Sequence, residues 1–194
     1  MVTRYCMMGF ALVFCTSAFA QELKEEKLDI DWRAAKAAAD ESLRSDKQGV
    51  DRFRAALPGN LNDVGVPVLV TGTGPVRATP RLQTQGDSYA ALYPLDRNAT
   101  LSIMGTARGV ALSGDAGVST DLADYDQGQF APLDDDADEG GASNAKEADF
   151  SFTKFGAAYT LRISCADAND ERCLKEDFAR SVASSLVQVG GAAQ

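Results

Sequence analysis

The stretch from Phe150 to Cys165, FSFTKFGAAYTLRISC, contains two runs in which apolar and polar residues alternate. The apolar residues of the first run stand at even positions, and those of the second run, 159–165, stand at odd positions. One straight strand cannot point both sets at the same core, because side chains alternate between the two faces of a sheet. The chain must therefore change phase between Lys154 and Ala157, and Gly156 is the residue suited to a hairpin turn or a bulge there.

Three further segments have the composition of β-strands. Residues 66–70 are rich in valine, and Pro67 suggests a strand start or an edge strand. Tyr89–Leu95 and Ala99–Ala107 are separated by the turn-forming residues 96–98, which makes them a plausible hairpin. The sequence therefore predicts about five antiparallel strands.

Helical spacing appears towards both ends of the chain. Asp31 is a suitable N-cap for a helix over residues 32–43, and a second short stripe covers residues 50–57. Apolar residues recur at steps of four and three from Leu174 to Val189, which predicts a final helix that ends at two glycines. Trp32 heads the first stripe, where a core position is favoured over a ligand platform. Residues 21–28 are charged and predicted to be a loose lead-in.

These elements together predict an α+β fold. An antiparallel sheet of about five strands would have the N- and C-terminal helices packed on one face. Residues 21–194 are enough for one domain with its own core, interrupted by an insertion at about 113–149.

The first twenty residues have the pattern of a cleaved secretory signal. Arg4 precedes a short apolar run, and Ala18 and Ala20 are the small residues that a signal peptidase requires. The run is shorter than the roughly 20 residues that span a bilayer. We therefore expect a mature chain that begins near Gln21 and is periplasmic or secreted, with no membrane anchor after cleavage.

Two cysteines remain after this cleavage, Cys165 and Cys173. In an oxidising compartment such a pair most simply forms one disulfide. The alternative is a redox-active pair, but catalytic dithiols usually stand two residues apart, and seven residues separate these two. A structural disulfide is therefore predicted.

The acidity of the chain is concentrated in the insertion. Residues 113–149 carry 11 acidic side chains and one basic side chain, Lys146. No basic patch suggests a nucleic-acid partner. Part of the insertion, residues 136–147, approximates a twelve-residue calcium loop, although Gly140 lacks the side-chain oxygen expected at its fifth position. A flexible acidic loop is the favoured interpretation, and the calcium candidates are Asp136, Asp138, Asn144 and Glu147.

The chain contains no histidine. Its absence excludes serine and cysteine catalysis in their usual histidine-dependent forms, as well as metal sites that need imidazole. No cofactor is predicted. Any enzymatic reaction would have to use carboxylates, lysine, serine or tyrosine.

A resemblance adds a location to this picture. It is carried by the signal, by Gly86–Tyr89, and by the closing block from Phe155 through Cys165 and Cys173 to the glycine pair at 190–191. On these residues the chain resembles small exported Gram-negative envelope proteins of unassigned function.

The prediction for function is a non-enzymatic periplasmic binding or accessory protein of the cell envelope, whose partner is an envelope protein or a small molecule. The alternative is a carboxylate-based hydrolase acting on envelope polymers. Two acids from separate strands in one concave pocket would favour the hydrolase, and a flat or grooved surface would favour binding.

Overall fold

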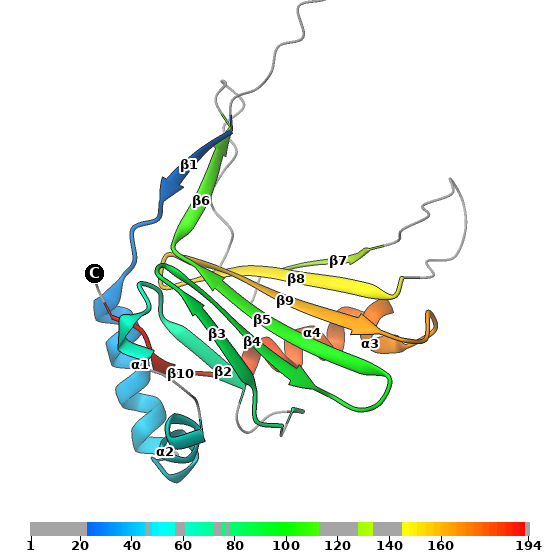
Figure 1. The fold of residues 1–194 in the computed structure, drawn as a ribbon, viewed down its shortest axis with the longest axis horizontal. Coiled ribbons are helices and arrows are strands. Elements are labelled where there is room, and N and C mark those ends of the chain that lie inside the picture. The colour runs from blue at the N-terminus through cyan, green and yellow to red at the C-terminus, as the bar shows by residue number, and fades with distance from the viewer. Residues whose placement is uncertain are drawn as a thin grey trace, which may run out of the picture.

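The structure is a computed structural model that describes residues 23–45, 47–56, 61–71, 75–76, 78–112, 128–133 and 145–192. The predicted signal and most of the acidic insertion lie outside these residues. The fold is mixed α+β (Figure 1). Its helical segments are α1 (Trp32–Ser45), α2 (Lys47–Ala56), the 3-10 turn η1 (Leu61–Asp63), α3 (Glu171–Leu174) and α4 (Glu176–Ser184). None of the described helices is long and apolar enough to cross a membrane.

The largest sheet has six antiparallel strands in the order β3-β4-β5-β9-β8-β7. Their bounds are β3 (Arg81–Gln85), β4 (Ser88–Pro94), β5 (Ala99–Thr106), β7 (Gln129–Leu133), β8 (Glu147–Lys154) and β9 (Ala157–Cys165). Two smaller antiparallel pairs join β1 (Leu23–Lys27) to β6 (Arg108–Leu112) and β2 (Val68–Thr71) to β10 (Leu186–Gly190). In Figure 1 the β1-β6 pair projects away from the six-stranded sheet.

The phase change predicted between Lys154 and Ala157 is a two-residue hairpin turn. Lys154 pairs with Ala157, and the residues between them, Phe155 and Gly156, have φ values of 55° and 79°. Two consecutive left-handed residues match the right-handed twist of the flanking strands. The turn brings both apolar sets to one face, because Phe150 pairs with Leu161 and Phe152 pairs with Tyr159. The hairpin between β4 and β5 is confirmed as well.

One face of the six-stranded sheet forms the core. Alternate residues of β4, β5, β8 and β9 are buried on this face. They pack with β2 and β10 and with the buried side of α4, namely Ala179, Val182 and Ala183. Helices α3 and α4 contact β8 and β9, and Figure 1 shows both helices behind the sheet.

Tyrosine side chains join the two layers. The hydroxyl of Tyr89 hydrogen-bonds Leu69, that of Tyr93 accepts from the amide of Thr71 at 3.1 Å, and that of Tyr159 donates to the carbonyl of Pro67 at 2.9 Å. Strand β2 pairs with β10 through backbone hydrogen bonds. The tyrosine hydroxyls therefore supply hydrogen-bond partners to polar backbone groups of β2 and of Pro67 just before it, which would otherwise be costly to bury.

A glycine makes room for two of these tyrosines. Gly105 of β5 lies between Tyr89 and Tyr159 in the sheet. A Cβ atom at this position would collide with the Tyr89 ring and would lie 2.8 Å from Cε1 of Tyr159. The close approach of the two rings therefore requires glycine.

The prediction of one helix from Leu174 to Val189 is wrong. Helix α4 ends at Ser184, and residues 186–190 form β10, which pairs with β2. Leu186 and Val189 continue the helical spacing of α4, but the segment is also rich in residues that favour strands. The partner strand β2 is buried at every position, and pairing with it makes residues 186–190 a strand and not a continuation of the helix.

Several strands were not predicted. Residues 23–27 lie in the segment interpreted as a loose lead-in, yet they form β1 and pair with β6. Strand β2 was predicted within residues 66–70, but it pairs with β10 and does not belong to the large sheet. Strand β3 carries a single apolar residue of partial burial, Leu82, and β7 lies within the segment interpreted as a flexible insertion. Such edge strands bury too little apolar surface to leave a clear pattern.

The first two helices pack against β10. The predicted cap is present, because the amide of Ala34 donates to Oδ1 of Asp31 at 2.9 Å. Ala35 of α1 is fully buried. Trp32 is only half-buried and lies outside the hydrophobic core, so the core position favoured for it is wrong.

Candidate binding face

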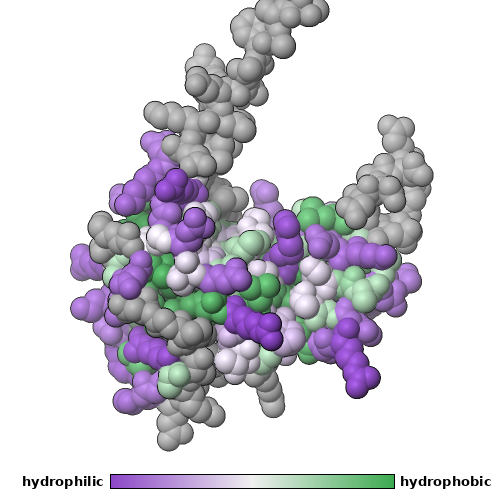
Figure 2. All heavy atoms as spheres, in the orientation of Figure 1, coloured by the Kyte–Doolittle hydropathy of each residue, from purple (hydrophilic) through white to green (hydrophobic). Residues whose placement is uncertain are grey.

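The face of the six-stranded sheet opposite the core carries side chains of a different kind. Alternation along β4, β5 and β9 places hydroxyl-bearing and small residues here, many of them half-buried. We call this side the open face. It includes Ser88, Ala90, Leu92, Ser102, Met104, Thr106, Ala158, Thr160 and Arg162. In Figure 2 apolar, near-neutral and hydrophilic side chains are interspersed over the middle of the molecule.

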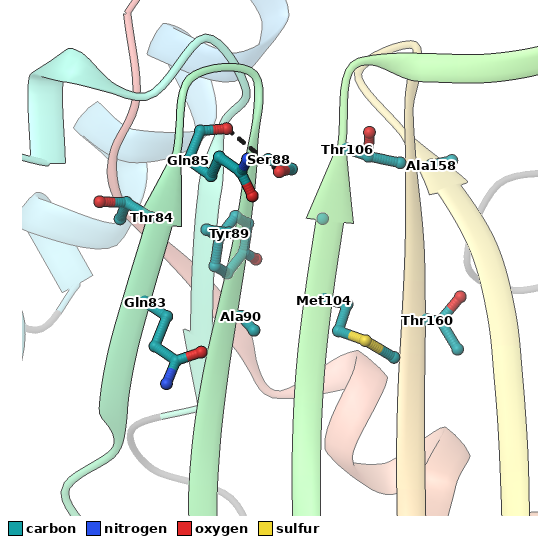
Figure 3. A pocket seen from close by; sticks show the side chains of 11 residues that line it. Gln83, Thr84, Gln85, Ser88, Tyr89, Ala90, Met104, Thr106, Ala158 and Thr160 are labelled. Atoms are coloured by element: carbon teal, nitrogen blue, oxygen red, sulfur yellow. Dashed lines mark hydrogen bonds between the residues drawn. The ribbon is translucent and has the colours of Figure 1, made fainter. Parts of the chain in front are cut away.

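A hollow of about 650 Å³ lies on the open face where β3, β4, β5 and β9 run side by side. Its size falls in the range of small-ligand and peptide sites. Figure 3 shows Met104 and Thr160 on neighbouring strands, with the amide side chains of β3 to one side. The polar lining side chains include Gln83, Gln85, Ser88, Thr106 and Thr160, and the apolar ones include Ala90, Met104 and Ala158.

The hollow is electrically neutral in its described lining. Amides, hydroxyls, alanines and one thioether surround it, and none of these groups ionises near neutral pH. The one titratable residue in the lining is Tyr89, whose hydroxyl bonds Leu69 on the core side of the sheet. Burial raises the pKa of Tyr89 well above its ordinary value. The hollow can therefore offer hydrogen bonds and apolar contact, but not charge.

Charged side chains lie further along the open face. Arg162 donates two hydrogen bonds of 2.8 Å to the two carboxylate oxygens of Asp149. This contact raises the pKa of the guanidinium. Glu147, two residues before Asp149 and on the same face of β8, accepts from the hydroxyl of Ser164 at 3.2 Å. Both carboxylates are thus engaged within the sheet.

The calcium candidate lies only partly within the described residues. Asp136, Asp138 and Asn144 lie outside the described residues. Glu147 is described and begins strand β8, where it faces Ser164. Among the residues with described positions, no group of three or more acidic or cysteine side chains is placed to hold a metal ion.

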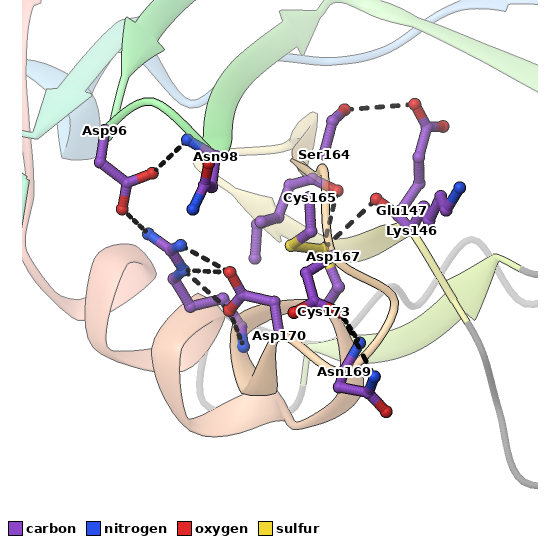
Figure 4. The surroundings of a disulfide bond; sticks show 12 residues. Asp96, Asn98, Lys146, Glu147, Ser164, Cys165, Asp167, Asn169, Asp170 and Cys173 are labelled. Atoms are coloured by element: carbon purple, nitrogen blue, oxygen red, sulfur yellow. Dashed lines mark hydrogen bonds and ion pairs between the residues drawn. A yellow bond between two sulfur atoms is a disulfide. The ribbon is translucent and has the colours of Figure 1, made fainter.

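The predicted disulfide between Cys165 and Cys173 is confirmed. It joins the end of β9 to α3, and both half-cystines are buried. Beside it, Arg172 pairs with Asp96 at 2.8 Å and also with Asp170, which caps α3 (Figure 4). Hydrogen bonds from Arg172 are the main cause that lowers the pKa of Asp96 and of Asp170. The network ties the turn after β4 to the disulfide and has a structural role.

No family model, no curated protein and no solved structure matches this chain.

The hollow on the open face was not predicted from the sequence. The β3 wall of the hollow was not predicted as a strand. Most of the other lining residues stand at the open-face positions of β4, β5 and β9, and these strands were recognised from the apolar residues on their opposite face. The available signal was the short run of neutral polar residues 83–85, QTQ, which ends at the turn before β4.

Proposed function

We propose that this protein is a non-catalytic binding protein of the periplasm, and that its open face binds a segment of another envelope protein at the hollow around Met104. The observation that carries the proposal is the contrast between the two faces of one sheet. One face is sealed by β2, β10, α3 and α4, whereas the other presents a neutral hollow of about 650 Å³.

The chemistry of the hollow suits a protein segment better than a charged ligand. Glutamine amides and threonine hydroxyls can hydrogen-bond the N–H and C=O groups of a polypeptide. Met104 adds an adaptable apolar surface, and methionine is enriched in the cores of protein interfaces. Leu92, 40% exposed on the same face, extends the apolar surface towards the sheet edge. An apolar centre with a polar surround is the usual composition of such an interface.

The location rests on two features of the chain. The first twenty residues have the pattern of a secretory signal. The disulfide between Cys165 and Cys173 supports an oxidising compartment, since such bonds seldom persist in the cytosol.

The geometry offers no comparable support for a carboxylate-based hydrolase. Such an enzyme needs two carboxylates facing one substrate across a concave site. No carboxylate is among the described residues that line the hollow. The neighbouring pair, Glu147 and Asp149, share one strand and are engaged by Ser164 and Arg162.

Immobilised protein tests the proposal directly. Met104→Arg places a long cation in the hollow, and Ser181→Arg places the same side chain on the exposed side of α4. Solubilised envelope proteins of the producing organism are passed over the wild type and both variants. The wild type and Ser181→Arg should retain the same protein, identified by mass spectrometry, and Met104→Arg should retain at least tenfold less of it. Equal retention by all three would contradict the proposal.

A further inference from the structure

A second hollow, of about 340 Å³, lies between α1 and the C-terminal end of β10. It is separate from the open face and shares no lining residue with the first hollow. Helix α1 contributes Trp32, Lys36, Asp40 and Leu43 to the lining, α2 contributes Arg54, and β10 contributes Gln188.

Gln188 is the residue that suggests a ligand here. Its side chain is buried, with 7% of the residue exposed. Nε2 donates to the carbonyl of Gly190 at 3.2 Å, but Oε1 is buried with no hydrogen-bond partner. It is the one such side-chain atom found among the described residues. A buried acceptor without a donor costs stability, which a ligand N–H group would recover.

The backbone around Gln188 is fixed in place. Gly191 has a φ of 96° and donates to the carbonyl of Leu61 at 2.9 Å, and Ala192 donates to the carbonyl of Val64 at 3.0 Å. A Cβ atom on Gly191 would collide with the carbonyl oxygen of Val66. This wall of the hollow is therefore preformed, and the unpartnered oxygen is held at a defined position.

The remaining lining residues indicate which ligand would supply the N–H. Trp32 and Leu43 offer an apolar surface. Lys36 and Arg54 are cationic, and Arg54 is oriented by a 3.1 Å hydrogen bond from Nε to the carbonyl of Val189. Asp40 is anionic. The lining thus combines both signs of charge with an apolar wall and one buried acceptor.

We propose that this second hollow binds a small zwitterion with an apolar side chain, either a free amino acid or a short peptide. Its carboxylate pairs with Lys36 and Arg54, and its apolar side chain packs against Trp32. An N–H group of the ligand donates to Oε1 of Gln188. The proposal is independent of partner binding at Met104.

Tryptophan fluorescence measures this binding without a label, because Trp32 is the only tryptophan of the chain. The probes are leucine, phenylalanine, leucyl-leucine and N-acetyl-leucine amide, which keeps the apolar side chain and N–H groups but has no charges. At least one charged probe should give a saturable change, and the capped amide should bind at least tenfold more weakly. A stronger response to leucyl-leucine identifies a peptide site, and a stronger response to the free amino acids identifies an amino-acid site.

Two variants and two controls complete the test. Gln188→Leu removes the unpartnered acceptor and should weaken binding about tenfold, the loss of one hydrogen bond. Lys36→Gln, at an exposed position where folding is not at risk, should weaken it about threefold. Arg44→Gln, on α1 but outside the lining, and Met104→Arg should bind like the wild type. Absence of a saturable change with every charged probe would overturn the proposal, as would unchanged affinity in both Gln188→Leu and Lys36→Gln.

Discussion

The hydroxyl of Tyr89 lies 2.9 Å from both the amide nitrogen and the carbonyl oxygen of Leu69. One phenolic group on the large sheet thus accepts from and donates to the same residue of β2. The contact is buried, and it joins the two layers of the core by hydrogen bonds as well as by apolar packing.

Replacing Tyr89 by phenylalanine should destabilise the protein by about 1–3 kcal/mol, because two buried backbone groups of Leu69 lose this partner. Urea unfolding of wild type and variant measures the difference in the free energy of unfolding. Tyr93→Phe, which removes one hydrogen bond to Thr71, should have a smaller effect. An unchanged unfolding midpoint in Tyr89→Phe would show that the Leu69 contact contributes nothing.

The buried tyrosines also predict a loss of stability at alkaline pH. Burial raises the pKa of Tyr89, Tyr93 and Tyr159 above the ordinary value of 10.0. As the pH rises, the unfolded chain therefore loses these phenolic protons at a lower pH than the folded protein does. The contribution of the three tyrosines to the free energy of unfolding is complete below pH 10 and declines as the pH rises above it. Each tyrosine adds a slope of about 1.4 kcal/mol per pH unit. Tyrosinate absorbance should appear for these residues only together with unfolding, and ionisation of all three near pH 10 in the folded state would contradict this.

The ion pairs of Arg172 with Asp96 and Asp170 predict that stability has the opposite pH dependence in acid. The pKa values of Asp96 and Asp170 lie below 3.8 in the folded protein, so the stabilisation is present above this pH and is lost as the pH falls below it. Arg172→Gln removes the main cause of both shifts. Between pH 5 and about pH 2 the wild type should therefore lose more unfolding free energy than Arg172→Gln. Parallel losses in the two proteins would contradict a role for this network.

Gly105→Ala should strongly destabilise the protein. The cause is that the added methyl group has no space, and not that the backbone conformation requires glycine. The added methyl group would enter the space held by the rings of Tyr89 and Tyr159, both buried beneath β2. Overpacking of this kind costs about 1–3 kcal/mol. Thermal unfolding compares it with Ala90→Gly, a change at an adjacent strand on the open face. A Gly105→Ala variant as stable as the wild type would mean that the rings can move apart.

Reduction of the disulfide should lower the unfolding free energy by about 2.5 kcal/mol, the chain-entropy value for so short a loop. Cys165→Ala with Cys173→Ala should reproduce the effect without reductant. Thiol titration of the native oxidised protein checks the bond itself, and two reactive thiols there would contradict the structure.

The sequence predicted best where one face of an element is buried and the other is exposed. The alternation in β5, β8 and β9 and the turn at Phe155-Gly156 were recognisable because burial and periodicity agree. It predicted badly where that contrast is lost. Strand β3 is mostly exposed, and β10 has apolar spacing that also fits a helix. Strand β2, which is buried at every position, was predicted as a strand, but its pairing with β10 was not.

The candidate sites were harder to predict for a related reason. The hollow around Met104 is lined by neutral residues from four strands, and no single segment carries its pattern. The second hollow depends on Gln188, whose unpartnered oxygen exists only once β10 packs beneath α1. Trp32 lines this hollow, although its spacing in the sequence favours a position in the core.

Photocrosslinking in the cell tests the central proposal, the open face as the binding surface, most directly. A photoreactive phenylalanine derivative is placed at Met104 in the hollow, and at Ser181 on α4 as the matched control. Irradiation of the producing organism should yield one discrete adduct with an envelope protein from position 104 and none from position 181. The adduct should disappear when Ala90→Arg is added beside the photoreactive residue. Adducts of equal yield from both positions, or no adduct from position 104, would contradict the account.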